Sequence, residues 1–251
     1  MQTGVQIVIL AGGRGSRMGE TDIPKVLQPL HGKPLILHLL ENVKASEWDF
    51  KPIIVVGFKR EQVIAALGPG FLYAIQEAQL GTGHAVQCAL SQVTAKDILV
   101  LYGDMPFITA TSLQKLIKLH KNSNTKLTML TTIVSNFSGP YRSIEKYGRI
   151  IRDAERNIVA VREFKDAAAR ERSIPELNPG YYVFDVNWFK ETIGKVTTEN
   201  VQHEYYLTDM VALAINAGVR VASMTISPDE VLGVNTKTDL EIAHTVSNLK
   251  D

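Results

Sequence analysis

The stretch Val5–Met18 reads VQIVILAGGRGSRM, an apolar run that ends in glycines and continues into cations. An uninterrupted apolar run predicts a strand that is buried on both faces. The glycines let backbone N–H groups turn toward an anion, and Arg17 and Lys25 add positive charge close by in the chain. The stretch therefore predicts a strand that opens into a polyphosphate loop, although a glycine turn with two solvated cations satisfies the same residues.

Two well-known phosphate loops do not fit this sequence. A P-loop requires Ser or Thr after its Gly-Lys pair, whereas Gly32–Lys33 is followed by Pro34. The dinucleotide fingerprint requires a third glycine where, counted from Gly13 and Gly15, Met18 stands. These departures disfavour P-loop ATPases and Rossmann dehydrogenases.

The rest of the chain alternates between apolar runs rich in β-branched residues and helical patterns. This alternation predicts an α/β fold, Rossmann-like and doubly wound, with a mixed, mostly parallel sheet. Strands are expected at Val5–Leu10, Ile53–Val56, Ile98–Tyr102, Leu127–Val134, Tyr181–Phe184 and Val221–Ile226. Helices are expected at Leu35–Val43, Gln62–Leu67, His84–Gln92, Ser112–His120, Tyr206–Asn216 and Asp239–Leu249.

The pattern changes at about residues 135–180. Charges become dense there, short strand-like pieces appear at Arg149–Arg152 and Ile158–Val161, and no long helical pattern intervenes. We expect an antiparallel insertion that lies over the carboxyl edge of the sheet, where doubly wound folds bind ligands. Residues 1–251 are expected to form a single domain, because no linker or repeat divides them.

The composition excludes several classes of protein. The 251 residues carry a net charge of +1, which gives no general attraction for nucleic acid or an anionic membrane. No apolar stretch approaches the roughly 20 residues of a membrane span, and the N-terminus lacks the pattern of a signal peptide. Cys88 is the single cysteine, which fits a reducing compartment, and its apolar surroundings predict a buried helical position. We expect a cytoplasmic protein.

A second apolar strand ends in Tyr102-Gly103-Asp104, so that a carboxylate follows the strand directly. A carboxylate at the carboxyl end of a central strand, beside a phosphate loop, suits Mg²⁺, which takes hard oxygen ligands and bridges to phosphates. A turn-forming Asp before Pro106 explains the same residues. The two interpretations are about even on this stretch alone.

The run Gln76–His84 is polar, contains glycines and leads into a helix. Amide side chains carry donors and acceptors and therefore suit the edge of a base. A loop with Thr82 as helix N-cap and a solvated His84 is the plain alternative. Further candidates are Gly148, Glu163, Asn178 and Asn235, and none is persuasive singly. A turn explains Gly148, a solvated pair with Lys165 explains Glu163, and a helix N-cap explains Asn235. Their order along the chain is more informative.

Together these pieces resemble the nucleotidyltransferases that make sugar nucleotides, and most closely the uridyltransferase domains of bifunctional bacterial N-acetylglucosamine-1-phosphate uridyltransferases. The resemblance covers nearly the whole chain. Its most specific parts are the runs QLGTGHA, which begins at Gln79, and EYYLTD, which begins at Glu204. The other matching pieces are Leu10–Met18, Pro24–Lys25, Leu101–Pro106, Tyr147–Ile150, Glu163–Asp166, Asn178–Gly180 and Gly233–Asn235.

The resemblance implies a nucleotide-diphospho-sugar transferase fold with a sugar-binding insertion, and it implies roles for single residues. The nucleotide would be lined by Leu10, Ala11, Gly12, Gly13, Gln76, Gly81 and Thr82, with Gln76 and Gly81 at the uracil. The catalytic cations at the phosphates would be Arg17 and Lys25, and the ligands of Mg²⁺ would be Asp104 and Asn235. The amino sugar and its ribose neighbour would be contacted by Tyr102, Gly148, Glu163 and Asn178.

The implied reaction joins UTP and N-acetylglucosamine 1-phosphate into UDP-N-acetylglucosamine and pyrophosphate. Gly12 stands where the family commonly has Ala, Pro179 where it has Thr, and Phe164 where it has His. These departures leave open another sugar 1-phosphate such as glucose 1-phosphate, the use of dTTP, or a sugar-nucleotide-binding protein without turnover. Because the chain stops before an acetyltransferase β-helix could begin, acetyl transfer is not expected and a monomer is mildly preferred.

Overall fold

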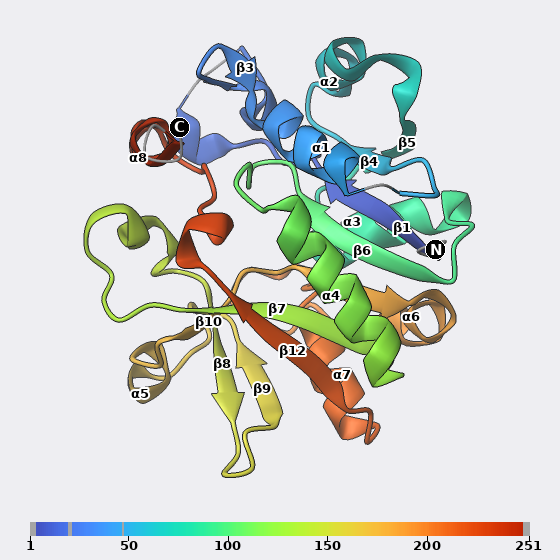
Figure 1. Ribbon diagram of the computed structural model, residues 1–251, viewed down its shortest axis with the longest axis vertical. Helices are drawn as coiled ribbons and strands as arrows, with labels where there is room; N and C mark the ends of the chain where they lie inside the picture. The colour runs from blue at the N-terminus through green and yellow to red at the C-terminus, as the bar shows by residue number, and fades with distance from the viewer. Residues whose placement is uncertain (1–3, 20–21, 47, 248–251) are drawn as a thin grey trace.

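The computed structural model describes residues 4–19, 22–46 and 48–247. A single mixed sheet runs through these residues (Figure 1). Its first half is parallel, in the order β5 (Leu72–Ile75), β4 (Ile53–Val56), β1 (Val5–Leu10) and β6 (Asp97–Tyr102). The expected mostly parallel α/β sheet is confirmed, and β1 and β4 have the bounds that their apolar runs predict.

The second half of the sheet is mixed. Strand β11 (Tyr182–Asp185) runs antiparallel to β6 and to β7 (Leu127–Ile133), whereas β12 (Val221–Ile226) runs parallel to β7. The antiparallel strands of the insertion then extend the sheet through β10 (Glu176–Asn178), β8 (Gly148–Arg152) and β9 (Ile158–Arg162). The insertion is antiparallel, as expected, but its strands continue the central sheet and do not form a layer over it.

Helices cover both faces of the sheet (Figure 1). One buried core joins the sheet to α1 (Leu35–Ala45), α2 (Arg60–Leu67) and α4 (Ala110–Ser123). The other core joins it to α3 (Thr82–Ala89), α6 (Val186–Thr192) and α7 (Asp209–Asn216). Alternate residues of β1 enter opposite cores, which explains why the whole strand is apolar apart from Gln6.

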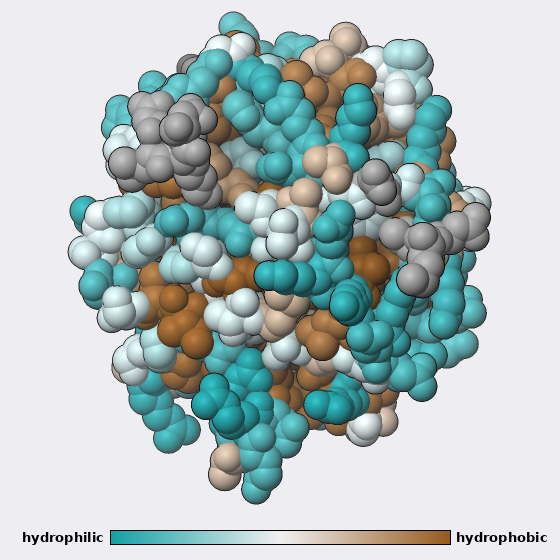
Figure 2. All heavy atoms as spheres, viewed as in Figure 1, coloured by the Kyte–Doolittle hydropathy of each residue, from teal (hydrophilic) through white to brown (hydrophobic). Residues whose placement is uncertain are grey.

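The remaining helices are α5 (Ala169–Arg172) and α8 (Lys237–Ser247). Residues 248–251 lie outside the described part of the chain, so the expected end of the last helix at Leu249 falls there too. Two short strands, β2 (Pro29–Leu30) and β3 (Lys33–Pro34), pair with each other apart from the main sheet. In the face shown by Figure 2, hydrophilic side chains predominate and the hydrophobic ones form separate small patches.

Several elements differ from the sequence expectation. Strand β5 was missed because it is only four residues long and lies at the edge of the sheet, with Ile75 exposed. Helix α6 was missed because it is only two turns long, although Asp185 caps it by accepting a hydrogen bond from the backbone of Trp188 at 2.9 Å. No helix within residues 4–19, 22–46 and 48–247 is long and apolar enough to span a membrane.

Candidate active site

The glycine loop Ala11–Gly15 leaves the carboxyl end of β1 and is held against β4. The backbone N–H of Ala11 donates to the carbonyl of Val55 at 2.8 Å, and that of Phe58 donates to the carbonyl of Gly12 at 3.1 Å. Gly15 has a φ of +65°, and a Cβ there would lie 2.8 Å from Cβ of Lys25. The loop therefore needs glycine at this position, both for its backbone conformation and for the close approach of Lys25.

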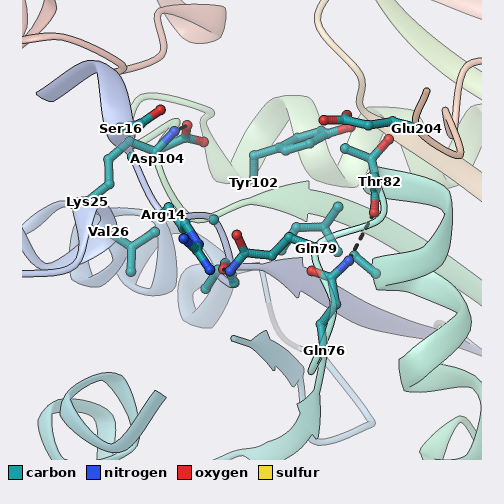
Figure 3. A pocket seen from close by; sticks show the side chains of 17 residues that line it. Arg14, Ser16, Lys25, Val26, Gln76, Gln79, Thr82, Tyr102, Asp104 and Glu204 are labelled. Atoms are coloured by element: carbon teal, nitrogen blue, oxygen red, sulfur yellow. Dashed lines mark hydrogen bonds and ion pairs between the residues drawn. The ribbon is translucent and has the colours of Figure 1, made fainter. Parts of the chain in front are cut away.

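A cavity of about 410 Å³ lies over this loop. All seven residues expected to bind the nucleotide line it: Leu10, Ala11, Gly12, Gly13, Gln76, Gly81 and Thr82. Lys25, Asp104 and Tyr102 line the same cavity. Figure 3 shows Lys25 and Asp104 together at one end, which we call the charged end, and Gln76 beside Thr82 at the other, which we call the amide end.

The charged end joins segments that are far apart in the sequence. The Nζ of Lys25 donates to a carboxylate oxygen of Asp104 and, at 2.9 Å, to the side-chain oxygen of Asn235. Arg17 donates to the same oxygen of Asn235 at 3.0 Å. The structure thus brings together the two expected catalytic cations and the two expected metal ligands. Arg17 is exposed and lines a neighbouring cavity of about 730 Å³, together with Asn235.

The side-chain oxygens of Asp104 and Asn235 converge on one atom, the Nζ of Lys25. They are hard donors, and two protein oxygens at a site for phosphates suit Mg²⁺, which usually keeps several waters and binds phosphate oxygens as well. Among the residues that the structure describes, no group of three or more His, Cys, Asp or Glu side chains could form a closed metal site. The side-chain oxygens of Asp104 and Asn235 are therefore chemically compatible with Mg²⁺.

The amide end is built around the carboxamide of Gln76. The Nε2 of Gln76 donates to the carbonyl of Gly81 at 3.1 Å and lies 3.2 Å from the Nδ1 of His84. Gln79, whose role the sequence did not indicate, donates to the carbonyl of Gly12 at 3.0 Å. A Cβ on Gly12 would lie 3.1 Å from the Oε1 of Gln76, so glycine at position 12 leaves room for that oxygen beside the loop.

A second segment, which contains Tyr205, supports the amide end from behind. The backbone N–H of Tyr205 donates to the carbonyl of Leu80 at 2.8 Å, and the N–H of Gly83 donates to the carbonyl of Tyr205 at 2.8 Å. Gly81 has a φ of +113°, and a Cβ there would lie 2.6 Å from the Tyr205 carbonyl oxygen. The N-cap of α3 is Gly81 and not Thr82, whose Oγ1 instead accepts a bond from the N–H of Leu207 at 3.0 Å.

All four residues expected to bind the sugar line a second cavity of about 230 Å³: Tyr102, Gly148, Glu163 and Asn178. It shares Tyr102 and Thr82 with the first cavity, so the two adjoin. Asn178 is buried and donates to the hydroxyl of Tyr182 at 2.6 Å, while its oxygen accepts from the N–H of Gly180 at 3.0 Å.

Two carboxylates near this second cavity have raised pKa values. Burial, more than any other cause, raises the pKa of Glu163, although the hydroxyl of Thr208 donates to it. Burial, followed by the nearby charge of Asp166, raises the pKa of Asp209 to about 6. Glu163 therefore does not form the solvated pair with Lys165 that was the plain alternative, and a titratable group that faces a cavity in this way is characteristic of functional sites.

Sequence reasoning missed several residues that line these cavities. Glu204 borders the first cavity, the second cavity and the cavity around Arg17, and Lys146 and Tyr147 border the last two. The run that begins at Glu204 and the tyrosine before Gly148 both belonged to the matched pieces, which was the available signal. Cys88, expected to be buried, is half-buried, with its Sγ 3.7 Å from the Nε2 of His84.

Comparison with known proteins places this geometry in context. Residues 7–138 match the family described as MobA-like NTP transferase domain. The chain is 39% identical over 240 residues to the bifunctional protein GlmU of Caldicellulosiruptor saccharolyticus, covering 94% of this chain and 50% of that protein. It is 42% identical over 242 residues to GlmU of a Geobacillus species, covering 95% of this chain and 51% of that protein. The chain thus spans about half the length of these curated relatives.

A solved structure has the same fold. The crystal structure described as UDP-glucose pyrophosphorylase complexed with UDP-glucose superposes with a TM-score of 0.76, at 16% sequence identity, covering 100% of both chains. At this identity the likeness shows the fold, and it confirms the expected nucleotide-diphospho-sugar transferase architecture.

Proposed function

Since this chain belongs to the family of MobA-like NTP transferase domains, we propose that it transfers the uridylyl group of UTP to N-acetylglucosamine 1-phosphate. The products are UDP-N-acetylglucosamine and pyrophosphate. The observation that carries this proposal is the pair of adjoining cavities, one over the glycine loop and one within the insertion, with the charged end at the first of them. Such an arrangement suits a nucleotide and a sugar phosphate held side by side.

In the proposed reaction, a phosphate oxygen of the sugar 1-phosphate attacks the α-phosphorus of UTP. A bond forms between that oxygen and the α-phosphorus, and the bond from the α-phosphorus to the bridging oxygen breaks, so that pyrophosphate leaves with the bonding electrons. The nucleophile is already an anion, so the step needs no general base. Its main obstacle is the repulsion between two anions and the charge that accumulates on the leaving group.

The charged end answers this obstacle. Lys25 in the first cavity and Arg17 in the neighbouring one carry positive charge and would bind and stabilise the phosphates as charge moves onto the leaving group. Asp104 and Asn235 would hold Mg²⁺, which when bound neutralises phosphate oxygens and aligns the two reactants. Lys25 contacts both oxygen donors and thereby holds a positive charge beside the place where the phosphates would bind.

The amide end and the second cavity would supply selectivity. Gln76 and Gly81 would meet the uracil, and Thr82 would lie beside it. Tyr102, Gly148, Glu163 and Asn178 would contact the amino sugar and the ribose next to it. The choice of sugar rests on the similarity to the GlmU proteins, which are about twice as long as this chain.

A substrate matrix tests the proposal. Pyrophosphate release would be measured with UTP, dTTP, CTP and ATP, each paired with N-acetylglucosamine 1-phosphate or glucose 1-phosphate, with Mg²⁺ and with excess EDTA. We expect the highest kcat/KM with UTP and N-acetylglucosamine 1-phosphate, and loss of turnover in EDTA. A preference for glucose 1-phosphate or dTTP would show that the substrate differs from the proposed one. Tight sugar-nucleotide binding without pyrophosphate release would indicate a binding protein.

A further inference from the structure

His84 lies behind the amide end and does not line the first cavity, yet it contacts the side chain that is expected to meet the base. It lies on the first turn of α3, half-buried, with its Nδ1 3.2 Å from the Nε2 of Gln76. Its other ring nitrogen, Nε2, lies 3.7 Å from the Sγ of Cys88, one helical turn further on. Both ring nitrogens therefore have partners inside the protein.

These contacts fix the hydrogen-bonding roles of each group. A carbonyl oxygen only accepts, so the carboxamide of Gln76 must turn its NH₂ group toward Gly81. The same NH₂ group reaches the Nδ1 of His84, which must then be the unprotonated, accepting nitrogen. The proton of the neutral imidazole is on Nε2, directed toward Cys88.

The oxygen of the Gln76 carboxamide is consequently left for the cavity. Both donor hydrogens of the side chain are used, by Gly81 and by His84. Oε1 lies on the side of the glycine loop, 3.1 Å from where a Cβ of Gly12 would stand. Gln76 itself is 5% exposed, so turning the carboxamide over would place its oxygen against two acceptors, the carbonyl of Gly81 and the Nδ1 of His84.

We propose that His84 is a positioning residue that holds the Gln76 carboxamide with its oxygen toward the base, so that the site selects bases with a ring N–H. This inference rests on the proposed function. Uracil presents a ring N–H at its pairing edge and would donate to the Gln76 oxygen. Cytosine presents an unprotonated ring nitrogen at the same place, so two acceptors would face each other, and it is rejected.

The test compares UTP with CTP for the wild-type chain, His84→Leu and His84→Asn. Leucine removes the acceptor, whereas the Oδ1 of asparagine can replace Nδ1. We expect His84→Leu to raise KM for UTP about tenfold, to leave kcat within about threefold and to lower the preference for UTP over CTP about tenfold. His84→Asn should stay within about threefold of the wild type in all three values.

A matched control is His38→Leu. His38 lies on α1, its Nε2 is 2.9 Å from the carbonyl oxygen of Leu30, and it lines neither substrate cavity. This variant should leave the preference for UTP unchanged. Binding of UTP and CTP by calorimetry, with thermal unfolding of each variant, supplies a readout that does not depend on turnover. If His84→Leu does not fold, His84→Ala and His84→Asn are compared in the same way.

The outcomes separate the two proposals. If the wild type binds UTP in preference to CTP without turnover and His84→Leu loses that preference, His84 acts as proposed and the proposed function fails. If the wild type turns over UTP and folded His84→Leu keeps the full preference, the role of His84 is overturned and the proposed function stands. Equal losses in His84→Asn and His84→Leu, or no preference for UTP in the wild type, also overturn the role of His84.

Discussion

The two ends of the first cavity are built by opposite means. At the charged end, Arg17, Lys25, Asp104 and Asn235 bond one another directly through charged or strongly polar groups, and Arg17 remains exposed. At the amide end, a buried Gln76 is held by uncharged partners. The charged groups at the first end can stabilise the phosphates as negative charge moves during the reaction. The fixed hydrogen bonds at the second end can distinguish one base from another. The two ends should therefore affect different kinetic constants.

The largest effect is expected from a substitution that disrupts the charged end. Asp104→Ala removes a carboxylate that bonds Lys25 and would hold Mg²⁺. We expect kcat to fall on the order of a hundredfold or more, because charge stabilisation in the transition state is lost. Steady-state pyrophosphate release measures it, with Asp229→Ala as the matched control on the short helical segment Pro228–Val231. Near-normal turnover of Asp104→Ala would remove this carboxylate from the mechanism.

The next effect concerns the amide end. In Gly81→Ala the new Cβ would lie 2.6 Å from the Tyr205 carbonyl oxygen, at a φ of +113°. The loop must shift, so we expect KM for UTP to rise about tenfold while kcat changes less. Gly218→Ala is the matched control, because Gly218 also has a positive φ but a Cβ there meets no atom within 4 Å. Equal KM values in the two variants would contradict the assignment of Gly81 to the nucleotide.

A smaller effect separates the second cavity from the first. Glu163→Gln keeps the size of a side chain that lines the second cavity and removes its charge. We expect KM for the sugar 1-phosphate to rise about fivefold and KM for UTP to stay unchanged, because one hydrogen bond to the sugar is weakened. Glu155→Gln, an exposed position in the same insertion, serves as control. A rise in KM for UTP alone would place Glu163 with the nucleotide.

The smallest effect is on stability. The pKa of Asp209 is raised from the ordinary value of 3.8 to about 6, so folding favours its protonated form. Its contribution to stability is full below about pH 4 and is lost as the pH rises through 6. The free energy of unfolding of Asp209→Asn should therefore be about 1 kcal/mol higher than that of the wild type at pH 8. This value allows for solvent screening of a partly exposed group.

Thermal and urea unfolding at pH 8 and pH 4.5 measure this difference. The advantage of Asp209→Asn should shrink toward zero at the lower pH, where the wild-type carboxyl is protonated as well. A constant difference at both pH values would mean that the substitution acts through packing and not through the charge of Asp209.

The sequence predicted the parallel half of the fold better than the rest. β1 and β4 are buried on both faces, so their apolar runs carry the whole signal. β5 lies at an edge with Ile75 exposed, and α6 depends on a local cap at Asp185, so neither leaves a long pattern. The place of β10, β8 and β9 in the same sheet depends on pairing with β7, which no local pattern reveals.

The site was predicted in two different ways. The glycine loop and Asp104 follow from local chemistry at the ends of strands. Asn235 has no such signal: it lies 218 positions from Arg17, and only the fold brings the two to 3.0 Å. His84 illustrates a different limit of sequence reasoning. Its position close to Gln76 can be read from the sequence, but which of the two side chains donates the hydrogen bond cannot.

The most direct measurement follows the phosphates of UTP. The wild-type chain would be given N-acetylglucosamine 1-phosphate, Mg²⁺ and UTP labelled either at the α- or at the γ-phosphate. We predict that the α-label appears in UDP-N-acetylglucosamine and the γ-label in pyrophosphate, in equal amounts. Release of the γ-label as inorganic phosphate, its appearance in the sugar product, or no transfer of the α-label would contradict a nucleotidyl transfer at this site.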